Sequence, residues 1–133
     1  MFKLFSIEEA NNMIPQVDAL MGTMQEDLSD ILRLRQEIAD ASSLSIEARN
    51  KAQELHFLVR DVQDIKVQLD NLGVFVKDVN AGLVEIPSQV GAEVVYLTWE
   101  KGQDSITHYH RLNEGTHLPL NVEPTTSSSI PQL

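Results

Sequence analysis

The side chains that could carry chemistry gather in the last third of the chain. Asp78 and Glu85 flank an Asn80–Gly82 turn, and His108 and His110 stand two residues apart. Because alternate residues of a strand share a face, two such imidazoles would lie side by side. Imidazole and carboxylate are ligands of zinc, manganese or iron where thiolates are absent, and the chain has no cysteine. The pattern predicts a divalent-metal shell of Asp78, Glu85, His108 and His110, with zinc or manganese as its ion.

The same four residues also fit an arrangement without metal. His108 and His110 would then be half-buried strand residues that hydrogen-bond to carbonyl groups or to Glu85. Four histidines in 133 residues is an ordinary number. The sequence holds no H-E-x-x-H motif, nucleophile elbow, P-loop or dinucleotide fingerprint. No catalytic residue is assigned on these grounds, and enzymatic activity stays an open question.

Composition narrows the range of partners. The chain has 20 acidic and 10 basic residues and a net charge of −10. Binding to nucleic acid or to an anionic membrane surface depends on lysine and arginine, so we expect neither partner. The apolar run at the N-terminus is too short for a secretory signal, which favours the cytoplasm. With 42% hydrophobic residues the chain can build a real core.

Two long helices should position the candidate residues. Ser6 and Glu9 have the spacing of a capping box, so a helix should begin there and run to about residue 40. Pro15 should kink this helix or start a fresh one. Its apolar residues follow heptad steps, as in a coiled coil, with Arg35 as a charged interruption. This predicted seam contains Ala10, Ile14, Val17, Met21, Met24, Leu28, Ile31 and Ile38.

A second helix is predicted over residues 46–72. Ser43 or Ser45 can cap its start, and Gly73 has the place of a glycine at a helix C-terminus. After Gly73 the apolar period changes from 3.6 to 2, which predicts strands over 74–79, 83–86, 93–99 and 106–112. The fold class is therefore α+β, a long antiparallel helical hairpin followed by a small antiparallel sheet of three or four strands. We expect one domain over residues 1–120, with the hairpin at 6–72 and the meander at 73–120, and a flexible tail at 121–133.

The hairpin carries more apolar surface than one partner helix can cover. Met13, Leu20, Leu32 and Leu34 lie outside the seam of the first helix, and Phe57 and Val67 lie outside that of the second. Two hairpins packed as a four-helix layer would bury this surface. The alternative is that the sheet and the N-terminal residues bury it within a monomer. We expect a homodimer or higher homo-oligomer through the helices.

Several segments together resemble a known family. The opening Phe5-Ser6-Ile7-Glu8-Glu9-Ala10-Asn11 is joined by Gly73-Val74-x-Val76-Lys77-Asp78, by Gly82-Leu83-Val84-Glu85-Ile86-Pro87, and by Tyr109-His110 ahead of Gly115. This set resembles the bacterial family called domain of unknown function 2203, sometimes labelled division-initiation-related. Its members typically have Trp-His where this chain has Tyr109-His110, and they often have Gly-Glu in the turn where it has Gly102-Gln103-Asp104. They typically have an arginine before a final Pro-Leu, and this arginine is missing ahead of Pro119-Leu120. The resemblance implies no activity, because the family has no established biochemistry.

Three functional hypotheses remain. The first is a non-enzymatic oligomeric interaction module that docks a protein partner, which fits the wide apolar stripe and the lack of a catalytic motif. The second is a divalent-metal-binding protein or metal-dependent hydrolase built on the four sheet residues. The third is a small-ligand sensor with a pocket between the sheet and the helix ends.

Overall fold

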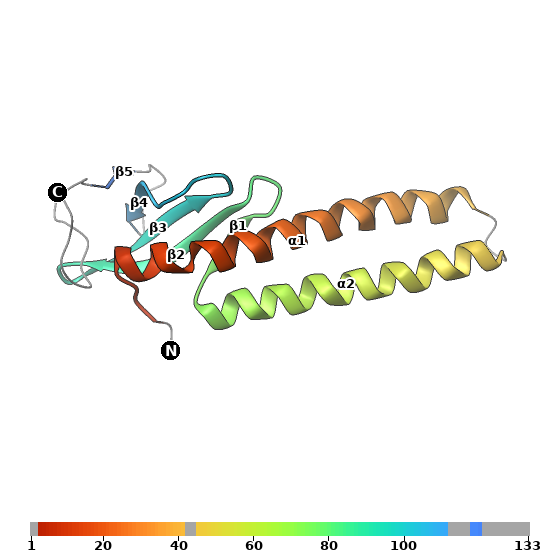
Figure 1. Cartoon of the computed structure of the whole chain (residues 1–133), viewed down its shortest axis with the longest axis horizontal. Coiled ribbons are helices and arrows are strands. Elements are labelled where there is room, and N and C mark those ends of the chain that lie inside the picture. Colours follow the sequence, from red (N-terminus) through yellow and green to blue (C-terminus); the bar gives the residue numbers. More distant parts are fainter. Residues whose placement is uncertain (1–2, 42–44, 112–117, 121–133) are drawn as a thin grey trace.

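The computed structural model describes residues 3–41, 45–111 and 118–120. Helix α1 (Ile7–Asp40) and helix α2 (Ile46–Leu72) lie side by side as a long hairpin. A sheet follows, formed by β1 (Phe75–Asp78), β2 (Leu83–Val90), β3 (Glu93–Glu100), β4 (His108–Arg111) and β5 (Leu118–Pro119). Figure 1 shows the sheet beside the N-terminal half of α1, with the other half of the hairpin projecting away from it. The predicted α+β class is confirmed.

Local interactions that the sequence predicts fix the start of α1 and the end of α2. Ser6 Oγ accepts from Glu9 N at 3.0 Å, and Ser6 N donates to the Glu9 carboxylate at 2.9 Å, which is the predicted capping box. Pro15 lies inside α1 and does not end it, so no fresh helix starts there. At the end of α2, Gly73 has φ +88°, a conformation that favours glycine. A β-carbon on Gly73 would also lie 2.8 Å from the Phe5 ring, so this turn strongly favours glycine.

The sheet is an antiparallel meander with the order β1-β2-β3-β4-β5. The longest pairing joins β2 and β3 over eight residues, from Leu83 opposite Glu100 to Val90 opposite Glu93. Strand β5 has two residues and pairs with the start of β4; the sequence analysis did not predict it. The predicted tail, 121–133, lies outside the described residues. No helix among those residues has the length and hydrophobicity needed to cross a membrane.

The main core lies between α1 and the inner face of the sheet. Polar contacts fix this packing: Gln25 Nε2 donates to Val79 O at 2.9 Å, and Lys101 Nζ lies 2.6 Å from an Asp18 carboxylate oxygen. The end of α2 contributes Ile65 and Leu69. The buried hydrophobic residues of this cluster are Phe5, Ala10, Ile14, Val17, Met21, Met24, Ile65, Leu69, Val74, Val84, Ile86, Val95, Leu97, Trp99, Ile106 and Tyr109. On α1 this core ends at Met24.

Beyond Met24 the buried seam of α1 differs from the predicted one. The structure buries Asp27, Ile31 and Leu34, whereas Leu28 is half-buried and Arg35 is exposed. The reason is that α1 faces the sheet over its first half and only α2 over its second half, so the buried stripe shifts around the helix. Leu28 and its neighbour one turn on, Leu32, are left on the flank of the hairpin. Leu32 is 67% exposed.

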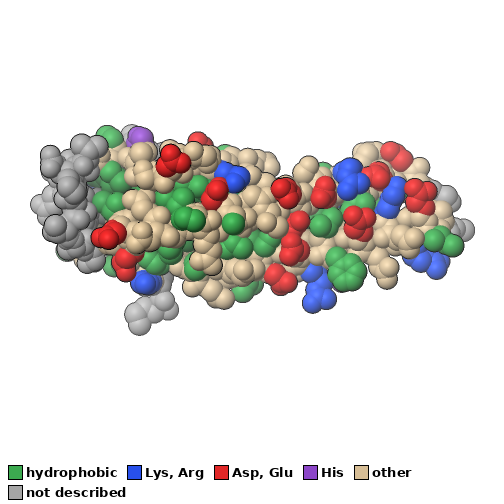
Figure 2. Space-filling view, viewed as in Figure 1, with side chains coloured by type: hydrophobic (Ala, Val, Ile, Leu, Met, Phe, Trp, Pro, Cys, Tyr) green, Lys and Arg blue, Asp and Glu red, His purple; other side chains and the backbone are tan. Residues whose placement is uncertain are grey.

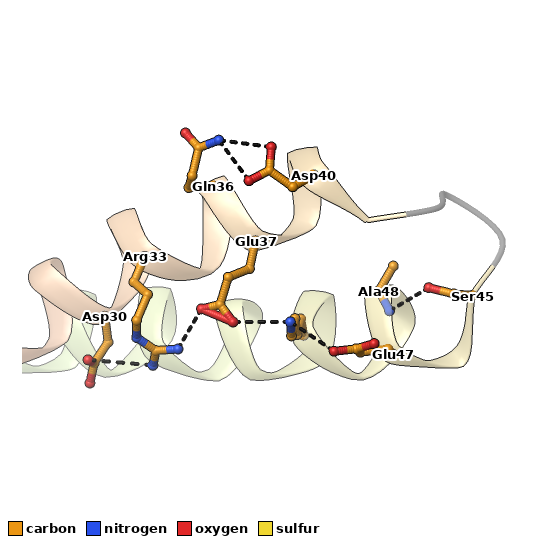
Figure 3. A network of polar contacts seen from close by, with 9 residues as sticks. Asp30, Arg33, Gln36, Glu37, Asp40, Ser45, Glu47 and Ala48 are labelled. Carbon is orange, nitrogen blue, oxygen red and sulfur yellow. Dashed lines mark hydrogen bonds and ion pairs between the residues drawn. The ribbon is translucent and has the colours of Figure 1, made fainter.

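A network of ion pairs links the two helices near the far end of the hairpin. Lys51 of α2 reaches across to Glu37 of α1 at 3.0 Å and also pairs with Glu47 at 3.2 Å. Arg33 contacts Glu37 at 2.7 Å, and Figure 3 shows the Glu37 carboxylate lying between the two helices. Hydrogen bonds from Lys51 and Arg33 lower the pKa of Glu37. Such partly exposed pairs order the end of the hairpin but add little stability.

Candidate functional site

The candidate residues of the sheet lie on its outer face, away from the helices. The pairing places Glu85 of β2 opposite Thr98 of β3, and Thr98 opposite His108 of β4. Tyr96 lies opposite His110 in the next row on the same face. The buried residues Val84, Ile86, Val95 and Leu97 alternate with these and point to the core. The sheet therefore brings Glu85, His108 and His110 to one surface, as the sequence predicts.

Glu85 and His110 form a direct contact across the sheet. His110 Nε2 meets Glu85 Oε2, and His110 Nδ1 lies 2.9 Å from the carbonyl oxygen of Arg111. The two side chains are only 10% and 12% exposed. Both ring nitrogens therefore lie within hydrogen-bond distance of an oxygen atom. The hydrogen-bonded alternative of the sequence analysis is confirmed for this pair.

Aromatic rings and one lysine surround this pair. The Tyr96 ring lies 5.5 Å from the His110 ring, centroid to centroid, and Phe75 meets Tyr96 edge-on at 6.4 Å. Lys77 Nζ lies 3.9 Å from Glu85 Oε1, with its own side chain 58% exposed. The apolar rings limit the access of water to the pair, which strengthens its hydrogen bonds. This part of the outer face is a packed polar cluster.

The other two predicted metal ligands have separate partners. His108 Nδ1 lies 2.8 Å from Thr107 Oγ1, and the Asp78 carboxylate accepts from Ala81 N at 3.2 Å within the β1–β2 turn. Among residues 3–41, 45–111 and 118–120, no three His, Asp or Glu side chains are grouped so that they could hold an ion. A metal bound by His110 would have to displace Glu85 or the Arg111 carbonyl. The four-residue metal shell stays a prediction.

The hairpin carries a second candidate surface, an apolar groove on the flank that faces the β1–β2 turn. The groove has a volume of about 410 Å³. Residues of α1 and α2 line the groove together with Asn80 of the turn. The lining residues are Leu28, Ile31, Leu32, Arg35, Val59, Val62, Gln63 and Asn80. Figure 2 shows many charged side chains on the visible surface of the projecting half of the hairpin.

At the same level of the hairpin, the seam holds a carboxyl group that sequence reasoning missed. Asp27 is 8% exposed, and its Oδ2 atom has no hydrogen-bond partner among the residues that the structure describes. Burial, and then the hydrogen bond and charge of Asp61 on α2, raise the pKa of Asp27 to about 6. The signal was present: an acid lies between Met24 and Ile31 at steps of 3 and 4 along an apolar stripe.

Comparison with known proteins identifies a family but no activity. The model of the family described as "Uncharacterized conserved protein (DUF2203)" matches residues 3–117. The chain belongs to this family, as its sequence motifs indicate. No curated protein matches the chain, and no solved structure matches it either.

Proposed function

We propose that this DUF2203 protein is a non-enzymatic interaction module of the cytoplasm that forms a homodimer through the projecting half of its hairpin. The observation that carries the proposal is the apolar groove beside Leu32. A second copy of the chain is the occupant that fits it best. The dimer would be a four-helix layer, with the two sheets held at its periphery as docking surfaces for a protein partner.

The packing within one chain leaves this half of the hairpin incomplete. Among the described residues of α1 beyond Met24, only Ile31 and Leu34 are buried hydrophobic residues, and α2 adds Ala48 before Ile65. Two helices that share so few buried side chains leave much of their apolar surface uncovered by each other. Large apolar side chains remain exposed instead, including Leu32 at 67% and Phe57 at 66%. An apolar surface of this kind marks an interaction site.

A second copy suits the groove in shape and in charge. In a two-fold dimer the same patch serves both chains, so each Leu32 can enter the groove of the other. Arg35 lies at the groove of a hairpin with 13 acidic and 6 basic residues over positions 6–72. It can therefore meet an acidic side chain of the second copy. Full burial of one leucine contributes about 2 kcal/mol, so two contribute about 4 kcal/mol, or roughly a thousandfold in Kd.

The test is a change at Leu32 with a matched control on the same hairpin. Leu32→Lys should convert the dimer to a monomer in size-exclusion chromatography with light scattering. Because Leu32 is 67% exposed, the helix content should stay unchanged by circular dichroism. Val67 is 54% exposed and is no part of the groove lining, so Val67→Lys should remain dimeric. If both variants have the same oligomeric state, the result contradicts the proposed interface.

A further inference from the structure

The outer face of the sheet contains an open hollow beside the Glu85–His110 pair. Its volume is about 330 Å³, and its lining comes from three strands and one turn. The lining residues are Leu83 of β2, Thr98 and Glu100 of β3, Gln103 of the β3–β4 turn, and His108 of β4. Pockets that hold small molecules begin at about this size and place a few polar groups around an apolar wall. None of these residues lines the groove of the hairpin.

Thr98 carries the observation that points to a ligand. Its side chain lies between Glu85 and His108 in the row across β2, β3 and β4. Thr98 is 8% exposed, and its hydroxyl group is shielded from water and has no hydrogen-bond partner in the described part of the chain. An unpaired buried hydroxyl costs about 1 to 3 kcal/mol. In the proposed complex, a rotation about χ1 would turn the hydroxyl group toward a molecule seated in the hollow.

The other polar groups of the hollow are held in place by the turn. The Trp99 indole N–H donates to Gln103 O at 2.9 Å, and the Glu100 backbone N–H donates to the Gln103 side-chain oxygen at 3.0 Å. Gln103 therefore presents its amide NH₂ from a fixed position. His108 bonds through Nδ1 to Thr107, so its Nε2 faces away from that contact. These groups are arranged before any ligand binds, which lowers the entropy cost of binding.

The charge of the lining selects the kind of ligand. Glu100 is exposed, and none of the ion pairs found among the described residues involves it. Among the described residues, the lining contains this one carboxylate and neither lysine nor arginine. The protein as a whole has a net charge of −10, which attracts cations. An anionic ligand would meet only repulsion from Glu100, whereas an ammonium group would gain a charge-assisted hydrogen bond.

We propose that this hollow binds a small organic amine, with its ammonium group at Glu100 and a hydroxyl or other polar group at Thr98 and His108. The apolar part of the molecule would lie against Leu83. The site differs from the predicted metal shell, because it uses Thr98, Glu100 and Gln103 and leaves the Glu85–His110 contact intact. It is also independent of the proposed dimer.

The test is an NMR titration of the ¹⁵N-labelled full chain with 2-aminoethanol. Glycolate and ethylene glycol, of similar size, serve as the anionic and neutral probes. We expect saturable shifts of the Thr98, Gln103 and His108 amides with 2-aminoethanol alone. Glu100→Gln should weaken its binding at least about fivefold, as expected for a lost charge-assisted bond. The control Glu54→Gln, which removes an exposed carboxylate of α2, should bind normally.

A second variant separates binding from folding. Thr98→Val keeps the shape of the side chain and removes the unpaired hydroxyl, so it should raise the melting temperature while it weakens binding of 2-aminoethanol. Shifts of equal size with glycolate would overturn the proposal, as would unchanged affinity in Glu100→Gln. Shifts that never saturate would also overturn it.

Discussion

Replacement of Asp27 by asparagine should stabilise the protein at neutral pH and give no advantage in acid. Asp27 lies in the α1–α2 seam, where burial raises its pKa to about 6 and Asp61 adds to this effect. The remaining charged neighbours that raise it, Asp30 and Glu26, are also acidic. Asparagine has nearly the same shape, and its amide can donate to Asp61 as the protonated carboxyl does. The variant therefore mimics the protonated form at every pH.

The sign and the size of the expected change in stability follow from the raised pKa of Asp27. The folded value of about 6 lies above the ordinary value of 3.8, so the folded chain binds this proton more tightly than the unfolded chain. The stability of the wild type should fall as pH rises from about 4 to about 6. Two pKa units correspond to about 3 kcal/mol, which is a ceiling because both side chains can shift toward water. We expect about 1.5 kcal/mol, or roughly 5 °C in melting temperature.

Urea unfolding at pH 7.5 and at pH 4, followed by Trp99 fluorescence at a fixed protein concentration, measures this difference. Asp27→Asn should be more stable than the wild type at pH 7.5 and equal to it at pH 4. The control Asp64→Asn changes an exposed carboxylate of α2 and should shift stability by less than about 0.5 kcal/mol at either pH. A gain in the stability of Asp27→Asn that is the same at both pH values, or a loss of stability at pH 7.5, refutes the reasoning.

Other predictions concern the sheet and the tail. Glu85→Gln should cost about 1 to 3 kcal/mol in urea unfolding, because it weakens a buried pair; a double-mutant cycle with His110→Asn that shows no coupling contradicts this. The metal hypothesis predicts bound zinc or manganese in the purified protein and its loss when His108 and His110 are both changed to alanine. Elemental analysis that finds no metal in the wild type rejects it. Truncation at Glu123 should leave the melting temperature within a few degrees; a larger fall shows a docked tail.

Most of the fold could be predicted from the sequence because its signals are local. The capping box at Ser6, the glycine at position 73 and the change of period after it each act over a few residues. The effect of Pro15 was harder to predict, since a proline inside a helix can kink it, end it or be tolerated. The two residues of β5 are too few to show a period, and only their pairing with β4 defines them as a strand.

The sites depend on contacts that periodicity does not encode. Strand alternation places Glu85 and His110 on one face, but only the register shows that they touch. A regular heptad predicts Leu28 in the seam, whereas α1 changes its packing partner after Met24 and buries Asp27 instead. That shift could not be derived from α1 alone, because it depends on where the sheet ends. The groove beside Leu28 and Leu32 is a consequence of the same shift.

Sedimentation equilibrium of the wild-type chain tests the central claim most directly. The chain has a mass of 14.9 kDa, so the proposed dimer has a mass of about 30 kDa. We predict that the dimer predominates at tens of micromolar and dissociates on dilution with a single association constant. A mass near that of one chain over the whole concentration range would contradict the account, because the groove and Leu32 would then face water with no partner.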